Sequence, residues 1–230
     1  MRVLAIDTAL AACSAALLDT EDGVLVSESL PMMRGHAEAL MPLIARLMDS
    51  AGLDFRRIDR VAVTTGPGSF TGLRVGIAAA RGIALAADRP AIGLSTLAAY
   101  AAPHMAADNS VPVVAAVDAR HQHVYLQVFA AGGRSFSTPR LAPVHEAARA
   151  LAATPSRIVG SAAEAVAAAL SPTEPAPTAI DARPAPDIAW VARMGAVVPE
   201  GQSPPKPQYL RAPDAQPQNA ALLPRRLSPQ

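Results

Sequence analysis

The sequence predicts an α/β protein built from two related lobes. Two hairpins support this prediction, because each begins with a buried strand that ends in an aspartate, Asp7 in the first and Asp118 in the second. A strand, a turn and a helix follow each hairpin, at residues 60–87 and 157–170. A repeated unit of strands and helices favours two lobes, each with its own sheet. A chance likeness of short α/β units is the alternative.

Hydrophobic runs separated by turn signals define the elements of the first lobe. We expect strands at 3–8, 13–19, 23–30 and 60–65, helices at 36–52 and 75–87, and then a strand and a helix within 90–102. The first three strands read as an antiparallel meander. Gly52 is a typical helix stop, and Pro42 must either kink its helix or lie in the first turn.

The second lobe is expected to repeat this order. A strand ends at Asp118, a second strand ends at the Gly132-Gly133 turn, and a short helix follows the proline-rich residues 171–187. We therefore assign residues 1–105 to the first lobe, residues 106–215 to the second lobe with a C-terminal return segment, and residues 216–230 to a disordered tail.

Composition excludes several classes of function. The formal net charge is +1, so no strong overall field attracts nucleic acid or an anionic membrane. Cys13 is the single cysteine, which excludes a disulfide framework and suits a reducing cytoplasm. No run of eighteen apolar residues predicts a membrane span. Lys206 is the single lysine and follows two prolines, so no core lysine is expected for a Schiff base or a phosphate clamp.

The glycine-rich stretch TTGPGSFTGLRVGIAAARG, residues 64–82, resembles a phosphate-binding loop without matching one. It lacks the lysine of a P-loop, and Thr71 stands where the dinucleotide pattern needs its third glycine. Two interpretations remain. The stretch is either an anion-binding helix start or a tight strand-to-helix elbow, with Ser69 or Thr71 as the helix cap.

Several motifs, in order, resemble the bacterial TsaB family, also called YeaZ, which is similar to the TsaD/Kae-type proteins. They are AIDT, RGHAEALMPLI, GPGSFTGLRVG, GLSTLAA, VDAR followed by VY, and YLRAPDA. They cover about residues 1–215. The resemblance implies a two-lobed actin-like or sugar-kinase-like (ribonuclease H-like) fold, which agrees with the internal repeat.

The resemblance also implies a role in tRNA modification. TsaB-like proteins help to install threonylcarbamoyl on the adenosine next to the anticodon of tRNAs that read codons beginning with A. The transfer chemistry belongs to a TsaD-like partner, and a TsaE-like ATPase joins the complex. A TsaB-like chain is then a non-catalytic, cytoplasmic dimerisation subunit that forms a homodimer when alone. We expect tRNA to reach it only through the complex, because no basic patch interleaved with aromatics is visible.

The residues agree with a non-catalytic role. Catalytic relatives hold a metal with two histidines in the pattern H-x-x-x-H. Here His36 matches the first histidine, but Leu40 stands where the second histidine would be. Asp7, Thr8 and Asp118 stand where actin-like ATPases bind magnesium and nucleotide, but neither hairpin carries phosphate-loop glycines. We expect no catalytic residue, no metal and no cofactor, with weak ATP binding left open. A stand-alone ATPase or phosphotransferase and a glycoprotease-like hydrolase are the alternatives.

The predicted helices at residues 36–52 and 75–87 carry more apolar surface than one packed face requires. Residues 75–87 contain Arg81 as their one polar side chain, with Arg74 just before it on the same side. A fully internal helix is one interpretation, and a partner interface is the other. The predicted interface comprises Leu40, Met41, Ile44, Met48, Leu73, Gly76, Ile77, Ala80 and Ala84. Gly76, Ala80 and Ala84 would form a small-residue line where two helix backbones meet.

Overall fold

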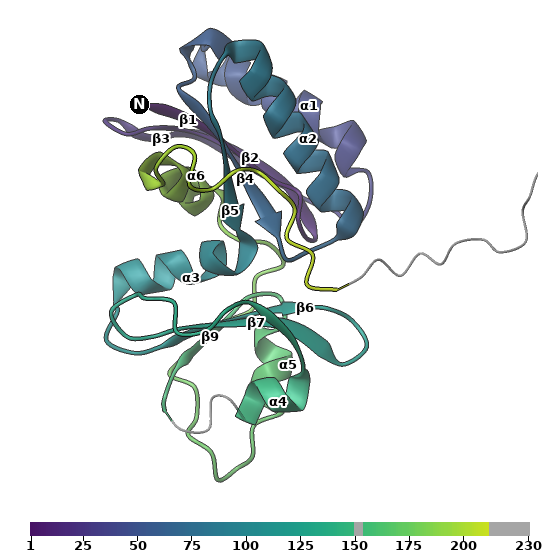
Figure 1. The fold of residues 1–230 in the computed structure, drawn as a ribbon, viewed down its shortest axis with the longest axis vertical. Coiled ribbons are helices and arrows are strands. Elements are labelled where there is room, and N and C mark those ends of the chain that lie inside the picture. Colours follow the sequence, from purple (N-terminus) through teal and green to yellow (C-terminus); the bar gives the residue numbers. More distant parts are fainter. Residues whose placement is uncertain (150–153, 212–230) are drawn as a thin grey trace, which may run out of the picture.

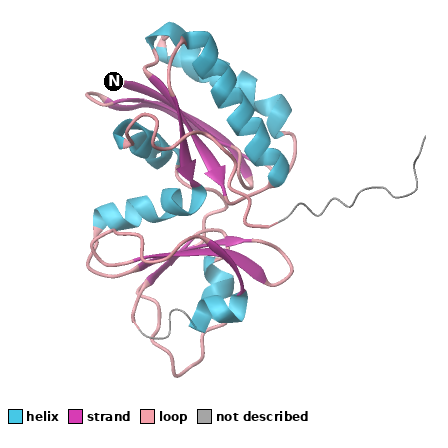
Figure 2. Cartoon of the chain, viewed as in Figure 1, coloured by secondary structure: helices cyan, strands magenta, loops and turns pink. Residues whose placement is uncertain are grey.

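The computed structural model describes residues 1–149 and 154–211, and it has two lobes stacked one above the other (Figure 1). Each lobe is built on a mixed five-stranded sheet. Helices cover both faces of the first sheet, and one helix lies between the two lobes (Figure 2). The predicted α/β fold of two related lobes is confirmed. The predicted disorder of residues 216–230 lies outside the described residues.

The first sheet has the strand order β3-β2-β1-β4-β5. Its strands are β1 (Arg2–Asp7), β2 (Ala12–Asp19), β3 (Gly23–Pro31), β4 (Arg60–Gly66) and β5 (Ala91–Ser95). β1, β2 and β3 form the predicted antiparallel meander, while β4 and β5 add in parallel. Every residue of β2 is buried, because helices cover both faces of this sheet.

The second sheet repeats the first, with the order β10-β9-β6-β7-β8. Its strands are β6 (Val113–Asp118), β7 (His123–Phe129), β8 (Arg140–Pro143), β9 (Arg157–Val159) and β10 (Ala179–Asp181). β6, β7 and β8 are the antiparallel counterpart of the first meander, and β9 and β10 again add in parallel. Asp7 and Asp118 therefore end equivalent strands, as the sequence predicts.

The helices follow the same repeat. α1 (His36–Ala51) and α2 (Phe70–Ala87) belong to the first lobe, and the shorter α4 (Val144–Arg149) and α5 (Ala163–Ala168) are their counterparts. α3 (Thr96–Ala107) packs on β6 of the second lobe, while α6 (Ile188–Val197) packs on β1, β2 and β4 of the first. Each lobe thus donates its last helix toward the other, and this exchange joins the lobes.

The core of the first lobe lies on both faces of its sheet. On one face, α1 and α2 pack against alternate residues of β1 such as Leu4 and Ile6. On the other face, α6 packs against Val3 and Ala5. By length and composition α2 is also apolar enough to cross a membrane, a test that a core helix also passes. Its Leu73, Ile77 and Ala80 belong to this core.

Two local features differ from the sequence-based expectations, and the position of Pro42 selects between two of them. α2 begins at Phe70 rather than at residue 75, because Ser69 caps it by accepting a hydrogen bond from the Gly72 amide. Pro42 lies inside α1, beyond the first turn. β8, α4 and β10 are short elements in segments where the sequence pattern predicts no element.

Residues 203–211, which we call the strap, follow α6 and run along the first lobe (Figure 1). The Ser203 carbonyl accepts from the Gly93 amide at 2.7 Å, and the Gln208 amide donates to the Thr65 carbonyl at 2.8 Å. A Cβ on Gly66 would lie 2.8 Å from the Gln208 carbonyl oxygen, and Gly66 has a φ of 118°. A glycine at position 66 therefore leaves room for the strap, because it has no side chain.

Candidate functional site in the cleft between the lobes

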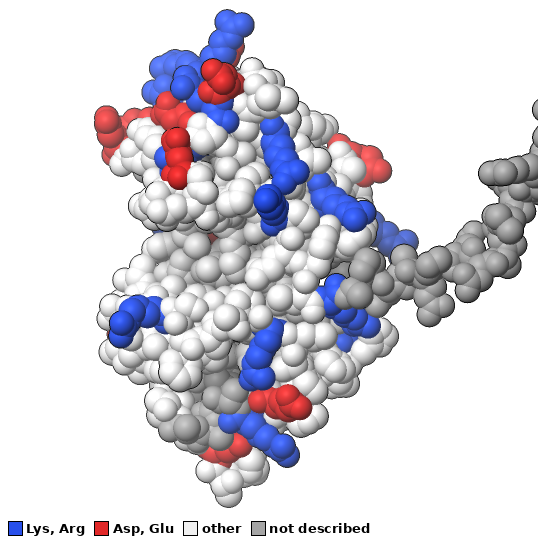
Figure 3. All heavy atoms as spheres, viewed as in Figure 1, with Lys and Arg blue, Asp and Glu red and all other residues white. Residues whose placement is uncertain are grey.

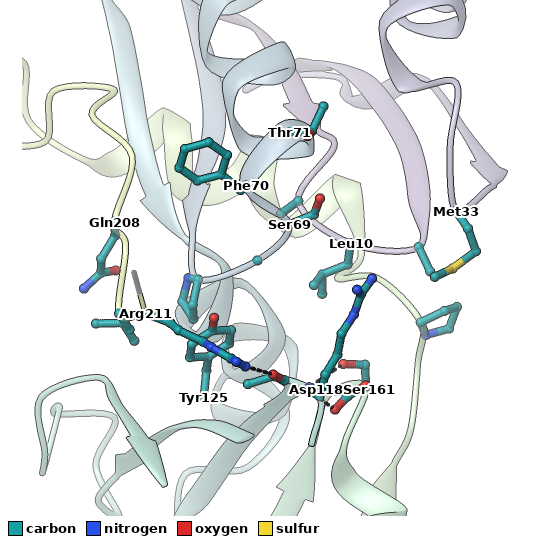
Figure 4. Close-up of a pocket in the computed structure, with 18 of the residues that line it drawn as sticks. Leu10, Met33, Ser69, Phe70, Thr71, Asp118, Tyr125, Ser161, Gln208 and Arg211 are labelled. Atoms are coloured by element: carbon teal, nitrogen blue, oxygen red, sulfur yellow. Dashed lines mark hydrogen bonds between the residues drawn. The ribbon is translucent and has the colours of Figure 1, made fainter. Parts of the chain in front are cut away.

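A cleft of about 710 Å³ opens where the two lobes meet (Figure 4). Its lining includes the loop after β1, the elbow between β4 and α2, the hairpin after β6, and the end of the strap. Figure 4 shows Ser69 and Phe70 on one side, Asp118 and Ser161 on the other, and Gln208 and Arg211 closing one end.

The elbow that opens α2 is packed against the end of β1 and its following loop. The Ser69 amide donates to the Ala9 carbonyl at 2.7 Å. A Cβ on Gly68 would overlap the Ala9 carbonyl oxygen, and a Cβ on Gly72 would overlap that of Thr8. These glycines therefore serve close backbone approach, which favours the tight-elbow interpretation over a phosphate cradle.

The hairpin after β6 brings Asp118 to the cleft. The Asp118 carboxylate accepts from the Arg120 amide at 2.8 Å, and the Asp118 amide donates to Ser161 Oγ at 3.1 Å. Arg120, His121 and Gln122 all have positive φ angles, between 51° and 62°. Non-glycine residues in this region are strained, so neighbouring contacts must hold this turn in place.

Asp7, the equivalent acid of the first lobe, does not line the cleft. Its side chain is fully buried, and Oδ1 accepts hydrogen bonds from Thr64 Oγ1 and from the Ala9 amide. Its Oδ2 has no hydrogen-bond partner among the described residues. Thr8 is also buried and donates from Oγ1 to the Gly72 carbonyl. The structure therefore separates Asp7 and Thr8 from Asp118, and only Asp118 lines the cleft.

Burial raises the pKa of Asp7 from 3.8 to about 6, although the Thr64 and Ala9 hydrogen bonds and nearby His36 oppose the shift. The folded state then holds a proton that the unfolded state releases between these two values. Stability contributed by this group is thus largest at acid pH and is lost as the pH rises from about 4 to 6.

We expect Asp7→Asn to remove the loss of folding stability that accompanies ionisation of Asp7. A shift of about two pKa units corresponds to about 3 kcal/mol at neutral pH. Urea unfolding at a series of pH values should show the variant gaining on the parent by about 2 to 3 kcal/mol between pH 4 and pH 7. Parallel pH profiles for the two proteins would show that Asp7 titrates normally.

His36 lies apart from two other histidines, His121 and His123, which belong to the hairpin after β6. His36 starts α1, and its Nε2 lies 3.1 Å from the Leu10 carbonyl oxygen. His121 is exposed in the strained turn, and His123 begins β7 with Nδ1 2.7 Å from the His121 carbonyl oxygen. Within residues 1–149 and 154–211, no group of three or more His, Cys, Asp or Glu side chains could hold a metal ion.

The predicted interface residues require correction. All except Met41 are buried: Leu40, Ile44, Met48, Leu73, Gly76, Ile77, Ala80 and Ala84. Seven of these eight belong to the core cluster that joins α1 and α2 to the sheet. Gly76 lies against Thr8, where a Cβ would overlap Thr8 Oγ1. The small-residue line therefore allows α2 to approach β1, so these positions serve the chain's own core.

An apolar groove of about 470 Å³ lies on the outer side of the same helices. It is lined by Met41, Asp54, Phe55, Arg56, Ala79, Gly82, Ile83, Ala86 and Ala87. Met41, one of the lining residues, is 49% exposed. An exposed apolar side chain of this size beside an apolar groove marks a surface that another protein could cover. Only Met41 is common to this groove and the predicted interface.

The geometry defines a class of protein: a two-lobed actin-like α/β fold with an internal duplication and with one of its two paired acids withdrawn into the core. The family model of TsaD, tRNA N6-adenosine threonylcarbamoyltransferase, matches residues 30–184. YeaZ from Pseudomonas aeruginosa has a similar structure, with a TM-score of 0.75, 30% identity, and coverage of 91% of this chain and 99% of that one.

Two sequence relatives support the same assignment. The Escherichia coli tRNA threonylcarbamoyladenosine biosynthesis protein TsaB is 41% identical over 125 residues, 54% of this chain and 53% of that protein. This match thus spans about half the length of the relative. An uncharacterised Mycobacterium tuberculosis protein is 31% identical over 94% of both chains. The chain belongs to the TsaB (YeaZ) family of TsaD-type proteins.

Proposed function

We propose that this chain is a non-catalytic, activating subunit in the transfer of threonylcarbamoyl to the adenosine beside the anticodon of tRNA. The E. coli and Haemophilus influenzae relatives are both named tRNA threonylcarbamoyladenosine biosynthesis proteins, while other relatives carry the name of the transferase. The chain shares its fold with both groups, so the role must be argued from its own residues.

The burial of Asp7 is the observation that carries the non-catalytic role. An acid at the end of β1 could hold a phosphate-bound magnesium ion only if its carboxylate faced the cleft. Here Asp7 has no exposed surface, and Thr64 and Ala9 occupy its Oδ1. The glycines of the elbow lie against Thr8 and Ala9, which leaves the elbow tightly packed. Both features favour a cleft that has lost phosphate chemistry.

The partner we propose is a TsaD-like catalytic subunit, docked on the groove between α1 and α2. The TsaD family model matches residues 30–184, and that range contains both helices. A TsaD-like protein therefore carries an equivalent helix pair, and two related helix pairs can pack face to face with approximate two-fold symmetry. The apolar lining of the groove and exposed Met41 supply the surface for such packing.

Three further proposals concern the assembly and its location, and the first of them uses the same groove. Without the catalytic subunit, a second copy of this chain would present the identical helix pair, so we propose a homodimer when the chain is alone. We further propose that a TsaE-like ATPase joins the complex, as the family resemblance implies, and that the protein works in the cytoplasm. Its single cysteine, Cys13, is buried, which suits a reducing compartment.

Reconstitution of tRNA modification tests the proposed role. A TsaD-like subunit with its ATPase should incorporate threonylcarbamoyl into tRNA only when this chain is added. Asp118→Ala should support modification within about twofold of the parent, because a merely structural carboxylate contributes far less than the 10²- to 10⁴-fold of a general acid or base. Circular dichroism confirms that the variant is folded.

A folded Asp118→Ala chain that binds its partner but abolishes modification would overturn the non-catalytic role. Titration calorimetry with MgATP addresses the stand-alone ATPase. Tight binding and turnover by the isolated chain would favour that enzyme, whereas the proposed subunit shows neither. Peptide-bond hydrolysis by the isolated chain would likewise favour the hydrolase.

A further inference from the structure

The strap brings basic and aromatic side chains from distant parts of the sequence onto one surface. Arg81 Nη2 donates to the Pro205 carbonyl at 2.6 Å, and Arg74 Nε donates to the Tyr209 hydroxyl at 3.1 Å. Lys206 lies between these two anchoring points of the strap and is exposed. Figure 3 shows Lys and Arg side chains over α2 and the strap, while acidic side chains on this face lie toward its margins. We call Arg74, Arg81, Lys206 and Tyr209 the basic strip.

Neutral groups hold the arginines of the strip in place. Their contacts are a backbone carbonyl, a phenol and a phenyl ring, and neither Arg74 nor Arg81 forms an ion pair within the described residues. Neither α2 nor residues 201–211 contains an Asp or Glu. By contrast, Arg46 pairs with Glu28 at 2.7 Å elsewhere on the surface. The strip therefore keeps its positive charge for an external anion.

Two aromatic rings, Tyr209 of the strip and the neighbouring Phe70, add a second chemical feature. The Arg74 guanidinium lies 3.7 Å from the centre of the Phe70 ring, and the Phe70 and Tyr209 rings lie 4.9 Å apart. Tyr209 is 41% exposed. An exposed guanidinium and an exposed phenol can both stack on unpaired bases, whereas an acidic polypeptide would chiefly use the positive charge.

We propose that the basic strip binds RNA, contacting the phosphate backbone through Arg74, Arg81 and Lys206 and an unpaired base through Tyr209. The inference rests on the proposed function, which supplies tRNA as the substrate of the complex. It replaces the sequence-based expectation that tRNA reaches this chain only through the complex, because the strap assembles a basic and aromatic surface that the sequence order does not show. At 100° per residue, Arg74 and Arg81 lie within about 20° of each other around α2, while Ala79 and Ala86 lie about 120° to 160° away from them. The docking groove and the strip therefore occupy different sides of α2, and a partner and RNA can bind together.

Fluorescence anisotropy with a labelled, unmodified tRNA transcript tests this proposal on the full chain. Binding should weaken as KCl rises, with a linear dependence of log K on log salt. The double variant Arg81→Gln/Lys206→Gln should lower affinity about tenfold and reduce the salt slope by about 1.5, or about 0.7 to 0.9 for each lost phosphate contact. Tyr209→Leu should weaken binding without changing the slope, because a base contact releases no counterion.

The matched control is Arg46→Gln/Arg193→Gln, which removes the same charge from two exposed positions. Arg193 lies on α6, across the sheet from α2. The control should keep the parent affinity and slope. Equal losses in both double variants, or no salt-dependent binding by the parent chain, would overturn the proposal. Polyglutamate that competes as well as RNA would also overturn it and indicate an acidic protein partner instead.

This binding test needs neither the catalytic subunit nor modification, so the two proposals fail separately. A chain that binds tRNA through the strip but does not support modification would contradict the proposed function alone. A chain that supports modification with no tRNA affinity of its own, and with Arg81→Gln/Lys206→Gln fully active, would contradict the basic strip alone.

Discussion

Replacing Ala80 with arginine is expected to unfold the chain. Ala80 has no exposed surface and lies in the core between α2, the sheet and α1. An arginine there would bury an unpaired charge and overfill the core, at a cost of about 5 kcal/mol or more. A domain of this size has about 5 to 15 kcal/mol of stability in total. Circular dichroism and urea unfolding should show loss of the native transition.

Ala78→Arg is the matched control, because Ala78 is exposed two residues earlier on the same helix. It adds the same side chain to α2 and should change stability by less than about 0.5 kcal/mol. A folded Ala80→Arg chain would mean that this position faces outward. The sequence-based interface on the small-residue line would then be restored.

The predictability of the fold follows from local patterns. The strand runs that end at Asp7 and Asp118, with their hairpin turns, predict the duplicated sheets, because alternation and turn chemistry are properties of adjacent residues. The short elements β8 and β10 escape such analysis. They have four and three residues, and only their pairing with β7 and β9 makes them strands.

The site was less predictable, because it depends on contacts between distant residues. Pattern alone shows that Gly76, Ala80 and Ala84 form a line, but it does not show whether that line meets another chain or β1. The core packing of α2 decides it. Likewise, no window of sequence contains both Arg74 and Tyr209, which are 135 positions apart and meet only because the strap returns to α2. The one available signal was the absence of acids around Arg74 and Arg81.

The groove between α1 and α2 provides the second large effect, on association rather than folding. We expect Ala86→Arg to weaken binding of a TsaD-like subunit about a hundredfold, and to weaken self-association similarly. Ala86 is exposed and lines the groove, so the isolated chain should accept the arginine, which can point into water. A partner that covers the groove must desolvate that charge without pairing it, and about 3 kcal/mol of the penalty corresponds to a hundredfold loss of affinity.

Analytical ultracentrifugation of Ala86→Arg, alone and mixed with the TsaD-like subunit, measures both associations. Ala78→Arg serves again as the control, since it places the same charge on α2 outside the groove lining. It should associate like the parent chain. If folded Ala86→Arg associates normally while Ala78→Arg does not, the partner covers the Arg74 side of α2. The groove would then be free, and the basic strip would be the surface that a protein partner occupies.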